Sequence, residues 1–334
     1  MTTLKEIAEK TGVSTATVSK ALNGKEDVSS VTRRKIKKAA EELGYLPNSI
    51  ARSLVNKKTN ALGLVTPYLE NPTTYQRLKG IQDACLQNNY ILISCLHEGN
   101  PKEEREQINA LISRKVDGLI LTPFGSDSNL LKMVTQSQIP FVLMSEMADG
   151  ISCDFVGEDD FEGGRMATEY LISLGHKNIA YFGNSSQLYS DRQLLGGYQS
   201  GLKNHGIEFK EELVNWGNTT TQTLKDNLEK LISLQNKPTA IVAWNDLLAI
   251  NILKSLEEKG LKVPEDMSIV GYDNIDFLSL FHIPLTTISQ PNYEIGRKSA
   301  EILLERIKRG EDGPVQKVIF KPELVVRKST SPPH

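Results

Sequence analysis

The sequence has little of what marks secreted, membrane-spanning or zinc-binding proteins. Its 334 residues include three cysteines, and Cys85, Cys95 and Cys153 form neither a CxxC pair nor a zinc-binding spacing. We therefore expect reduced, mostly buried thiols. Neither an apolar segment of the signal-peptide type nor a long apolar run is present, so nothing indicates export or membrane insertion. The sequence predicts a cytoplasmic protein.

Sequence signatures of common doubly wound enzymes are also missing. There is no GxGxxG after the first apolar run, no GxxxxGK[ST] loop, no HExxH and no GxSxG. The five histidines are scattered without obvious acid–base partners, and they are His97, His176, His205, His282 and His334. Isolated histidines are more often structural or surface residues than catalytic ones. We therefore predict a protein that is not an enzyme and needs no metal or other cofactor.

An overall excess of charge of one sign is lacking as well, because 39 Lys and Arg nearly balance 41 Asp and Glu. This balance hides an uneven distribution. Residues 1–60 hold twelve basic and six acidic side chains, a net charge of +6, whereas the remaining residues hold 27 basic and 35 acidic side chains, a net charge of −8. A basic head on an acidic body points to a polyanion that binds at one end of the chain.

What is present begins with two short helical patterns in the first 22 residues. Apolar or small side chains recur at i, i+3 and i+4 in residues 4–11 and again in residues 15–22, and Gly12 between them suits a turn. Ser14 is placed to cap the second helix. This pattern predicts a helix-turn-helix, whose second helix fits the major groove of DNA. From these residues alone, an ordinary helical hairpin with a solvated face remains an equal alternative.

Two further helical patterns follow the first pair. Residues 31–43 combine an apolar face with five basic side chains, and Gly44 is placed to end that helix. The segment 47–60 starts with a proline and gathers apolar side chains on one side, at Ile50, Ala51, Leu54 and Val55. A helix this short is marginal alone in water. We expect it to form only when something packs against it, or, as the alternative, its apolar residues to pack on the head.

Residues 61–334 alternate short, branched apolar runs with amphipathic stretches of helical length. This alternation predicts an α/β body with doubly wound, mostly parallel sheets. Because the rhythm occurs twice, we expect two lobes. Ligands bind at the carboxyl ends of the strands in such folds.

Polar side chains follow several of these predicted strands, at Asp159, Asp160, Asn245, Asp246, Asp273 and Gln290. A ligand crevice would use them, but Asn and Asp also favour turns and helix N-caps at strand-to-helix joints. We adopt the turn or N-cap interpretation for Asp159 and Asp246.

An ordered set of short motifs runs through residues 1–60. It comprises TGVSTATVSKALNG, Val28-Ser29, Thr32-Arg33, Gly44-Tyr45-Leu46-Pro47-Asn48, Ala51-Arg52-Ser53-Leu54 and Lys58-Thr59. This combination resembles the LacI family of bacterial transcription regulators, and weaker matches continue nearly to the C-terminus. The resemblance implies a helix-turn-helix headpiece at 1–46, a hinge helix and linker at 47–60, and an effector-binding and dimerisation domain at 61–334 of the periplasmic-binding-protein type. In that type the chain crosses between the lobes three times, here near Gly157, Gln290 and Phe320, which implies lobes of about 61–157 with 291–319 and about 158–290 with 320–334.

The same resemblance implies which residues contact DNA. Base-reading positions of the family fall on Thr15, Ala16 and Lys20. Positions that contact the DNA backbone fall near Ser14, Thr17, Ser19, Asn23 and Tyr45. The segment 48–56 would be a hinge helix that pairs with its dimer mate in the minor groove, with Ala51 and Leu54 against the DNA and Leu54 as a wedge between base pairs.

For the effector, the resemblance implies a pocket between the lobes. Its expected lining residues are Thr73, Thr74, Glu146, Ser190, Arg192, Thr219, Asn245, Asp273 and Gln290. The chain departs from the family pattern because the arginine that clamps the effector would fall at Leu194, with Arg192 offset by two. The usual aromatic platform falls on Thr219, and Thr73 and Thr74 occupy positions that are often aromatic. Either the ligand is smaller and more polar than usual, or a nearby aromatic substitutes, with Trp216, Tyr75 and Tyr189 as candidates.

Together these inferences predict a sequence-specific transcription regulator, a repressor, that binds a pseudo-palindromic operator as a homodimer. The expected effector is a sugar or sugar-derived metabolite. One alternative is a regulator that answers to a protein corepressor, although the helix expected over 293–309 carries Glu301 and Glu305 where that branch of the family uses basic residues. A second alternative is a solute-binding receptor, which has no use for a basic helical head. The C-terminal residues form no heptad repeat, so a four-chain assembly is not expected.

Overall fold

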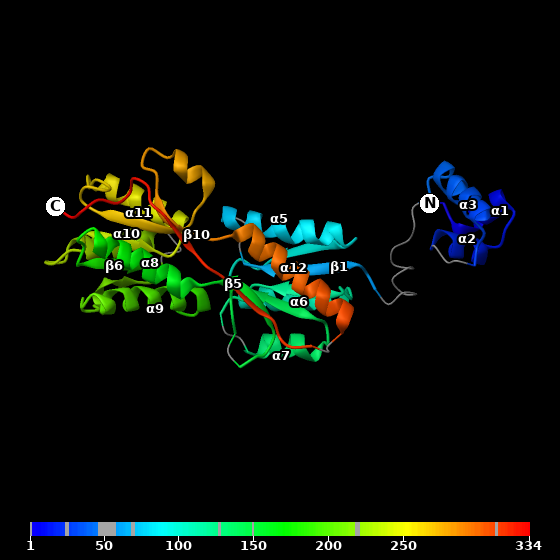
Figure 1. Ribbon diagram of the computed structural model, residues 1–334, viewed down its shortest axis with the longest axis horizontal. Helices are drawn as coiled ribbons and strands as arrows, with labels where there is room; N and C mark the ends of the chain where they lie inside the picture. The colour runs from blue at the N-terminus through cyan, green and yellow to red at the C-terminus, as the bar shows by residue number, and fades with distance from the viewer. Residues whose placement is uncertain are drawn as a thin grey trace. The chain divides into compact units, whose positions relative to one another are not determined.

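The structure is a computed structural model that describes residues 2–23, 27–45, 58–67, 71–125, 128–148, 150–217, 221–310 and 313–334. The chain divides into two compact units, residues 1–59 and 60–334 (Figure 1). Most of the predicted hinge, including Ala51 and Leu54, lies outside the described residues.

In the described residues of the first unit, three short helices are present, at the places that the sequence predicted. They are α1 (Leu4–Thr11), α2 (Thr15–Leu22) and α3 (Ser30–Glu42). Thr3 and Glu6 form a capping box at the start of α1, and Gly12 ends that helix with a φ of 72°, a backbone conformation that glycine adopts without strain. Ile7, Val18 and Ile36 are fully buried and join the three helices around one small core.

The second unit contains two six-stranded sheets. The first sheet has the strand order β11-β5-β4-β3-β1-β2, and all of its strand pairs are parallel. Its strands are β1 (Ala61–Thr66), β2 (Ile91–Leu96), β3 (Gly118–Leu121), β4 (Phe141–Met144), β5 (Asp154–Glu158) and β11 (Lys317–Phe320). Its helices are α5 (Pro72–Gln87), α6 (Pro101–Ser113), α7 (Ser128–Gln136) and α12 (Asn292–Arg309).

The second sheet has the strand order β12-β10-β9-β8-β6-β7, and its one antiparallel pair is β10 with β12. Its strands are β6 (Ile179–Phe182), β7 (Val214–Asn215), β8 (Ala240–Ala243), β9 (Ser268–Asp273), β10 (Thr286–Ser289) and β12 (Glu323–Val325). Its helices are α8 (Asp160–Ser173), α9 (Tyr189–Asn204), α10 (Thr221–Ile232) and α11 (Asp246–Glu258), with two 3-10 turns at Glu211–Leu213 and Asp276–Leu280.

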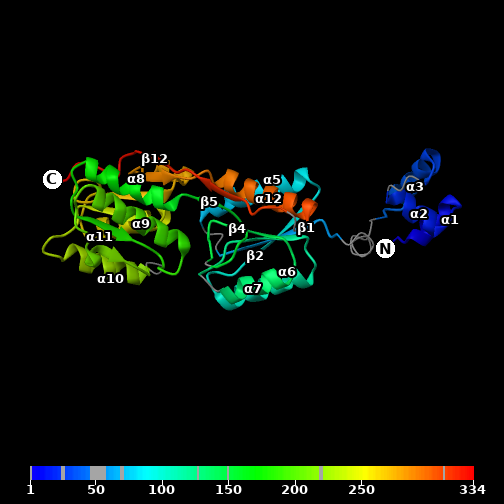
Figure 2. The ribbon, with the colours of Figure 1, turned by 60° about the horizontal axis from the view of Figure 1, so that its bottom comes forward.

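Helices cover both faces of each sheet, which explains why the central strands are apolar throughout rather than alternating. In the first lobe, α5 and α12 pack on one face and α6 and α7 on the other (Figure 2). In the second lobe, α8 and α9 cover one face and α10 and α11 the opposite one. Two separate layered cores therefore form, one in each lobe.

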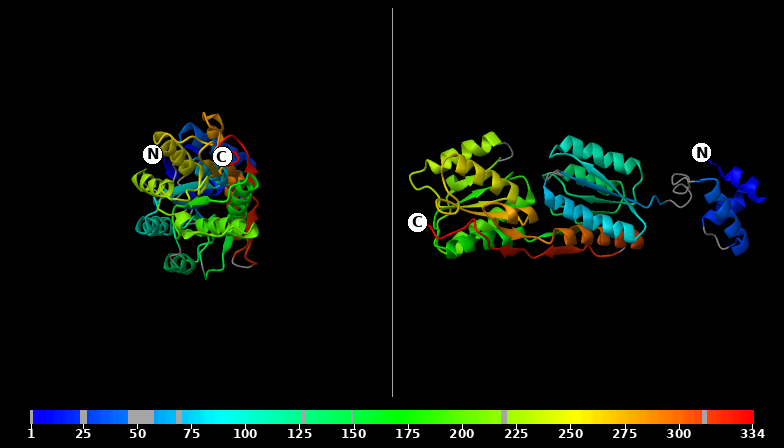
Figure 3. Two further views of the ribbon diagram at one scale, coloured as in Figure 1. Left: turned by 90° about the vertical axis from the view of Figure 1, so that its left-hand side faces the viewer. Right: turned by 90° about the horizontal axis from the view of Figure 1, so that it is seen from above.

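The chain passes between the lobes three times. The crossings follow β5, β10 and β11. The second crossing returns the chain to the first lobe, where α12 lies beside α5 (Figure 3, orange and cyan). Among the described helices, none combines the length and the apolar composition that a membrane span requires.

Candidate functional site

The exposed face of α2 consists of the residues that the sequence assigned to DNA. Val18 and Ala21 are buried in the headpiece core, so the opposite face of the helix is turned to solvent. Ser14, Thr15, Ala16, Lys20 and Asn23 are exposed, and Thr17, Ser19 and Tyr45 are partly exposed. The first unit thus presents a small, polar and basic helix face, which is the shape and chemistry that a DNA major groove accepts.

Two local contacts hold this face in position. Ser14 caps α2, because its Oγ accepts a hydrogen bond of 3.1 Å from the Thr17 backbone N–H. Lys20 forms an ion pair with Asp27, and both side chains are about half exposed, at 55% and 52%. Since an exposed pair of this kind contributes little stability, Lys20 can exchange Asp27 for another partner at small cost.

In the second unit, a cavity of about 130 Å³ lies between the two lobes. Seven of the predicted effector residues line it, namely Thr73, Thr74, Glu146, Ser190, Asn245, Asp273 and Gln290. Asn245 also caps α11, because its side-chain oxygen accepts a hydrogen bond of 2.7 Å from the Leu248 N–H. The seven residues converge because the carboxyl ends of parallel strands meet at one edge of each sheet, and the two edges face each other across the cavity.

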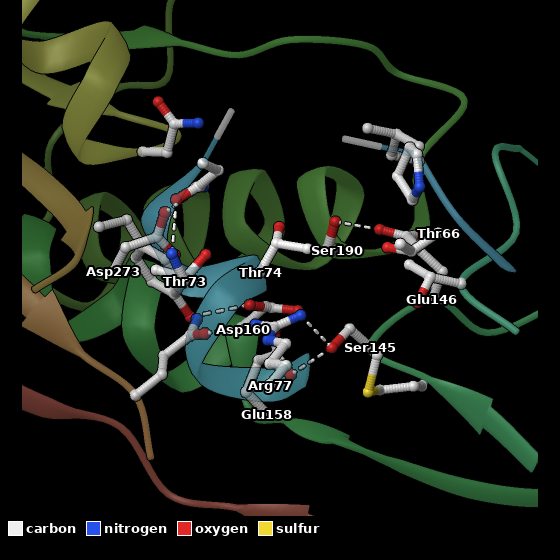
Figure 4. A pocket seen from close by; sticks show the side chains of 18 of the residues that line it. Thr66, Thr73, Thr74, Arg77, Ser145, Glu146, Glu158, Asp160, Ser190 and Asp273 are labelled. Carbon is white, nitrogen blue, oxygen red and sulfur yellow. Dashed lines mark hydrogen bonds and ion pairs between the residues drawn. The ribbon is translucent and has the colours of Figure 1, made fainter. Parts of the chain in front are cut away.

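Arg77 on α5 is the centre of the polar network at this cavity (Figure 4). Its guanidinium donates to Glu158 Oε1 at 2.8 Å, to Gln290 Oε1 at 3.0 Å, to Asn292 Oδ1 at 2.7 Å and to Ser145 Oγ. Ser145 Oγ in turn donates to Glu158 Oε2 at 3.0 Å. Because Glu158 and Gln290 stand where the chain crosses between the lobes, Arg77 ties α5 to two of the three crossings.

Two sets of hydrogen bonds join the lobes directly. Asn71 at the start of α5 donates to Asp273 Oδ2 at 2.9 Å, and Asp273 ends β9 in the second lobe. Glu146, which follows β4 in the first lobe, accepts 2.7 Å from the backbone N–H of Tyr189 and also accepts from the Ser190 hydroxyl. These contacts bridge the cavity, so a molecule bound there would change how the lobes are held together.

The carboxyl groups around the cavity titrate abnormally because water is excluded from them. Burial raises the pKa of Glu146 to about 7, against the hydrogen bonds from Ser190 and Tyr189. Burial and the nearby charge of Asp246 raise the pKa of Asp273 to about 8. Burial and the charge of Glu158 hold the pKa of Asp160 well above its usual range. Such perturbed carboxyls in a cleft mark a functional site.

Two of the eight described non-glycine residues with a positive φ line this cavity. Ser145 has a φ of 63° and directly follows β4, and Asp273 has a φ of 117° and ends β9, both in the region that glycine favours. Strain of this kind costs about 1–3 kcal/mol for each residue and persists where the surroundings enforce it. Here it orients two polar side chains into the cavity.

The prediction for Arg192 was wrong. Its guanidinium donates to the carbonyl of Gln187 at 2.8 Å and does not line the cavity, because it lies two positions from Leu194, which does. A two-residue offset on a helix rotates a side chain by about half a turn. Arg77 supplies the cation of the pocket instead. Thr219 lies outside the described residues.

The three aromatic residues that were candidates to replace the missing platform lie elsewhere. Trp216 packs edge-on against Tyr181, Tyr75 is 65% exposed, and Tyr189 contributes its backbone N–H to Glu146. None of the three lines the cavity. The aromatic side chains that do line it are Phe124, Trp244 and Tyr272.

The two aspartates assigned to structural roles lie outside the cavity lining. Asp159 caps α8 as predicted, accepting 3.0 Å from the Glu162 N–H. Asp246 does not cap a helix. It is fully buried and accepts 2.8 Å from the Ile275 N–H and 2.6 Å from the Thr287 hydroxyl, so it anchors the loop after β9.

Among the polar residues of the pocket, sequence reasoning missed Arg77, Ser145 and Glu158, whereas it named Asp160 among the candidate crevice residues. A signal for Arg77 was present, because it lies four residues after Thr73 and so on the same side of a helix. Ser145 follows and Glu158 ends a strand of the first lobe, and strand ends carry the ligand residues of such folds.

Comparison with known proteins agrees with both parts of this geometry. Residues 3–48 match the model of bacterial regulatory proteins of the lacI family, and residues 168–330 match a periplasmic binding protein-like domain. The chain is 34% identical over 330 residues to the HTH-type transcriptional repressor PurR of Vibrio campbellii, with 98% of each protein covered. The PurR of Photobacterium profundum is 33% identical over 332 residues, again with 98% of each covered.

The chain belongs to the lacI family. Its fold is similar to that of the lac repressor dimer bound to operator and the anti-inducer ONPF, with a TM-score of 0.88, 26% identity and 99% of each chain covered. It is also similar to the transcriptional regulator CelR in complex with cellobiose, with a TM-score of 0.75, 29% identity and coverage of 98% of this chain and 100% of that one. As a lacI-family member, the protein is a DNA-binding transcription regulator rather than an enzyme.

Proposed function

We propose that this lacI-family protein represses transcription in the cytoplasm by binding a pseudo-palindromic operator as a homodimer, under the control of a small molecule in the inter-lobe cavity. The observation that carries the proposal is the exposed face of α2, where Thr15, Ala16 and Lys20 stand clear of the headpiece core. A pure solute receptor would have no use for this face. Salt-dependent binding to genomic DNA fragments tests the proposal, because phosphate contacts make the affinity fall steeply with salt.

In this proposal the residues of the headpiece divide into two roles. Thr15, Ala16 and Lys20 read bases, whereas hydroxyl and amide groups nearby contact phosphates. The second group comprises Ser14, Thr17, Ser19, Asn23 and Tyr45. Ala51 and Leu54 of the hinge segment contact the minor groove. The polar and exposed character of α2 supports the base and phosphate contacts. The family relationship supports the contacts of Ala51 and Leu54 with the minor groove.

The effector binds, we propose, among Thr73, Thr74, Glu146, Ser190, Asn245, Asp273 and Gln290. The hydrogen bonds that Asn71 and Glu146 make across the cavity support a switch in which the ligand replaces or reinforces them. The resulting lobe movement would alter the spacing of the hinge segments, and a coupling of about 1–3 kcal/mol between the sites is enough for regulation.

A small molecule is favoured over a protein corepressor as the regulating ligand. Glu301 and Glu305 on α12 form ion pairs with basic residues of the same helix, Arg297 and Arg309. That surface therefore carries balanced charges rather than the basic cluster that the corepressor-dependent branch would need.

Replacing Lys20 with alanine should relax operator specificity at one base pair in each half-site. A lysine that donates to a base edge discriminates between bases by about 1–3 kcal/mol. Binding of wild-type and variant protein to a library of operators with single base changes measures this. Lys37→Ala on α3 is the matched control, because Lys37 is exposed outside α2. If Lys20→Ala weakens binding uniformly over all sequences, Lys20 contacts phosphate instead.

Replacing Leu54 with alanine should weaken operator binding by about 2–3 kcal/mol, because the smaller side chain cannot hold the kink that a wedge opens between base pairs. Thermal unfolding and effector binding should remain unchanged. Fluorescence anisotropy with a labelled operator measures the affinity. An unchanged affinity would refute the wedge assignment.

A further inference from the structure

The inter-lobe cavity carries more negative than positive groups. Its described lining residues include four carboxyl side chains, Glu146, Glu158, Asp160 and Asp273, and a single basic one, Arg77. Arg77 is paired with Glu158 at 2.8 Å, and the two side chains are 14% and 5% exposed. One carboxylate is thereby compensated by a cation, and the other three are not.

Those three carboxyl groups are held by neutral donors. Glu146 accepts from a backbone N–H and a hydroxyl, and Asp273 accepts from the Asn71 amide. Asp160 Oδ1 accepts 2.8 Å from the Tyr272 hydroxyl. Hydrogen bonds from neutral donors to a carboxylate are weaker than those from a cation, so a cation bound in the cavity would gain stronger hydrogen bonds from these groups than a neutral molecule would.

Asp160 offers such a cation a specific acceptor atom. The residue is only 4% exposed, and its Oδ2 has no hydrogen-bond partner among the described residues. A buried acceptor without a partner is destabilising, so native proteins rarely leave one without a function. Asp160 lines the cavity, and Figure 4 shows it beside Arg77.

The dimensions and walls of the cavity limit what can occupy it. Its volume of about 130 Å³ corresponds, at about 10–15 Å³ for each water-sized group, to on the order of ten non-hydrogen atoms. Polar groups such as Thr73, Thr74 and Asn245 alternate with apolar walls from Phe124 and Trp244. This combination fits a molecule of monosaccharide size with several hydroxyl groups and one apolar face.

We propose that the effector is a small polyhydroxylated amine, an amino sugar or an amino polyol, whose ammonium group donates to Asp160 Oδ2. This inference depends on the proposed function of the cavity as the effector site. Arg77, the basic side chain among the described lining residues, is already paired with Glu158, so sugar acids and phosphorylated sugars find no free cation there. An ammonium instead gains a stronger hydrogen bond from a carboxyl oxygen than the hydroxyl of the matching neutral sugar does.

Two matched sets of probes test the proposal on the full-length protein. The first set is glucosamine, glucose and glucuronate, and the second is glucamine, sorbitol and gluconate. Titration calorimetry should show that the amine of at least one set binds about tenfold more tightly than its neutral counterpart, or more. The reason is that a hydrogen bond to a charged group is stronger than one to a neutral group. The acid should not bind.

Adjacent residues of the chain provide the matched variants. Asp160→Asn should remove most of the preference for the amine, measured as the ratio of the amine and neutral-probe affinities of the same variant. Asp159→Asn should have no effect, because Asp159 caps α8 outside the cavity and asparagine caps equally well. A preference that survives Asp160→Asn would overturn the assignment, as would a panel in which no amine binds.

A cavity-filling variant separates this inference from the proposed function. Thr74→Trp should abolish binding of every probe, because Thr74 lines the cavity. If a neutral or acidic probe binds more tightly than the amine and Thr74→Trp abolishes that binding, the cavity is the effector site but the ammonium proposal is wrong. Binding that Thr74→Trp leaves intact would overturn both.

Discussion

Replacing Arg77 with methionine should destabilise the body of the protein by about 3–5 kcal/mol, because it leaves the Glu158 carboxylate buried without its partner. The variant also loses the hydrogen bonds to Ser145, Gln290 and Asn292. Two chain crossings are then no longer attached to α5. Urea unfolding followed by circular dichroism measures the loss as a lower midpoint.

Arg165→Met is the matched control for this prediction. Arg165 on α8 also pairs with two carboxylates, Glu162 and Glu169, but its side chain is 31% exposed. Solvent screens such a pair, so the control should cost no more than about 1 kcal/mol. Adding Glu158→Gln to Arg77→Met should restore part of the stability, since it removes the unpaired charge. Equal losses for Arg77→Met and Arg165→Met would contradict the central role of Arg77.

The second large effect is expected at Gly197 on α9. A Cβ at this position would overlap the carbonyl oxygen of Phe161 and lie 2.7 Å from the backbone N of Arg165, both on α8. Gly197→Ala should therefore force the two helices apart and destabilise the second lobe by about 3 kcal/mol, at the upper end of the cost of overpacking, because backbone cannot yield as a side chain can. Since α9 carries Ser190, probe binding in the cavity should weaken as well.

The neighbouring glycine is the control. A Cβ at Gly196 would make an ordinary contact of 3.4 Å with the ring of Phe161. Gly196→Ala should leave the protein unchanged or stabilise it by up to about 1 kcal/mol, because alanine favours a helix. Thermal unfolding of both variants compares them directly. A destabilisation by Gly196→Ala that equals that of Gly197→Ala would refute the close approach of α8 and α9 as the cause.

Local sequence patterns were sufficient to predict the three described helices of the headpiece. The cap at Ser14, the turn at Gly12 and the spacing of apolar residues fixed the three helices to within one or two residues. Each of these signals acts within one or two turns of chain, so no knowledge of distant contacts was needed. The same holds for the alternation of strands and helices in the body, which predicted two layered α/β lobes.

Local sequence patterns predicted only part of the pocket. Asp273, Gln290 and Asn245 could be predicted because they follow strands, and strand ends of parallel sheets converge. Arg192 was misplaced because a motif match with a two-residue offset does not fix the face of a helix. The aromatic lining was missed because Phe124, Trp244 and Tyr272 come from three separate segments, and no sequence spacing relates them.

The sequence by itself determined the architecture of this protein, its family and the polar, exposed face of α2, since each follows from patterns within a single helix or strand or from motifs in a fixed order. Only the tertiary structure decided the chemistry of the cavity. The burial of Glu158, Asp160 and Asp273 beside a single arginine among the described lining residues arises where strand ends of the two lobes face each other. Charge compensation and desolvation depend on which groups lie within a few ångströms in space, and sequence separation does not record that distance.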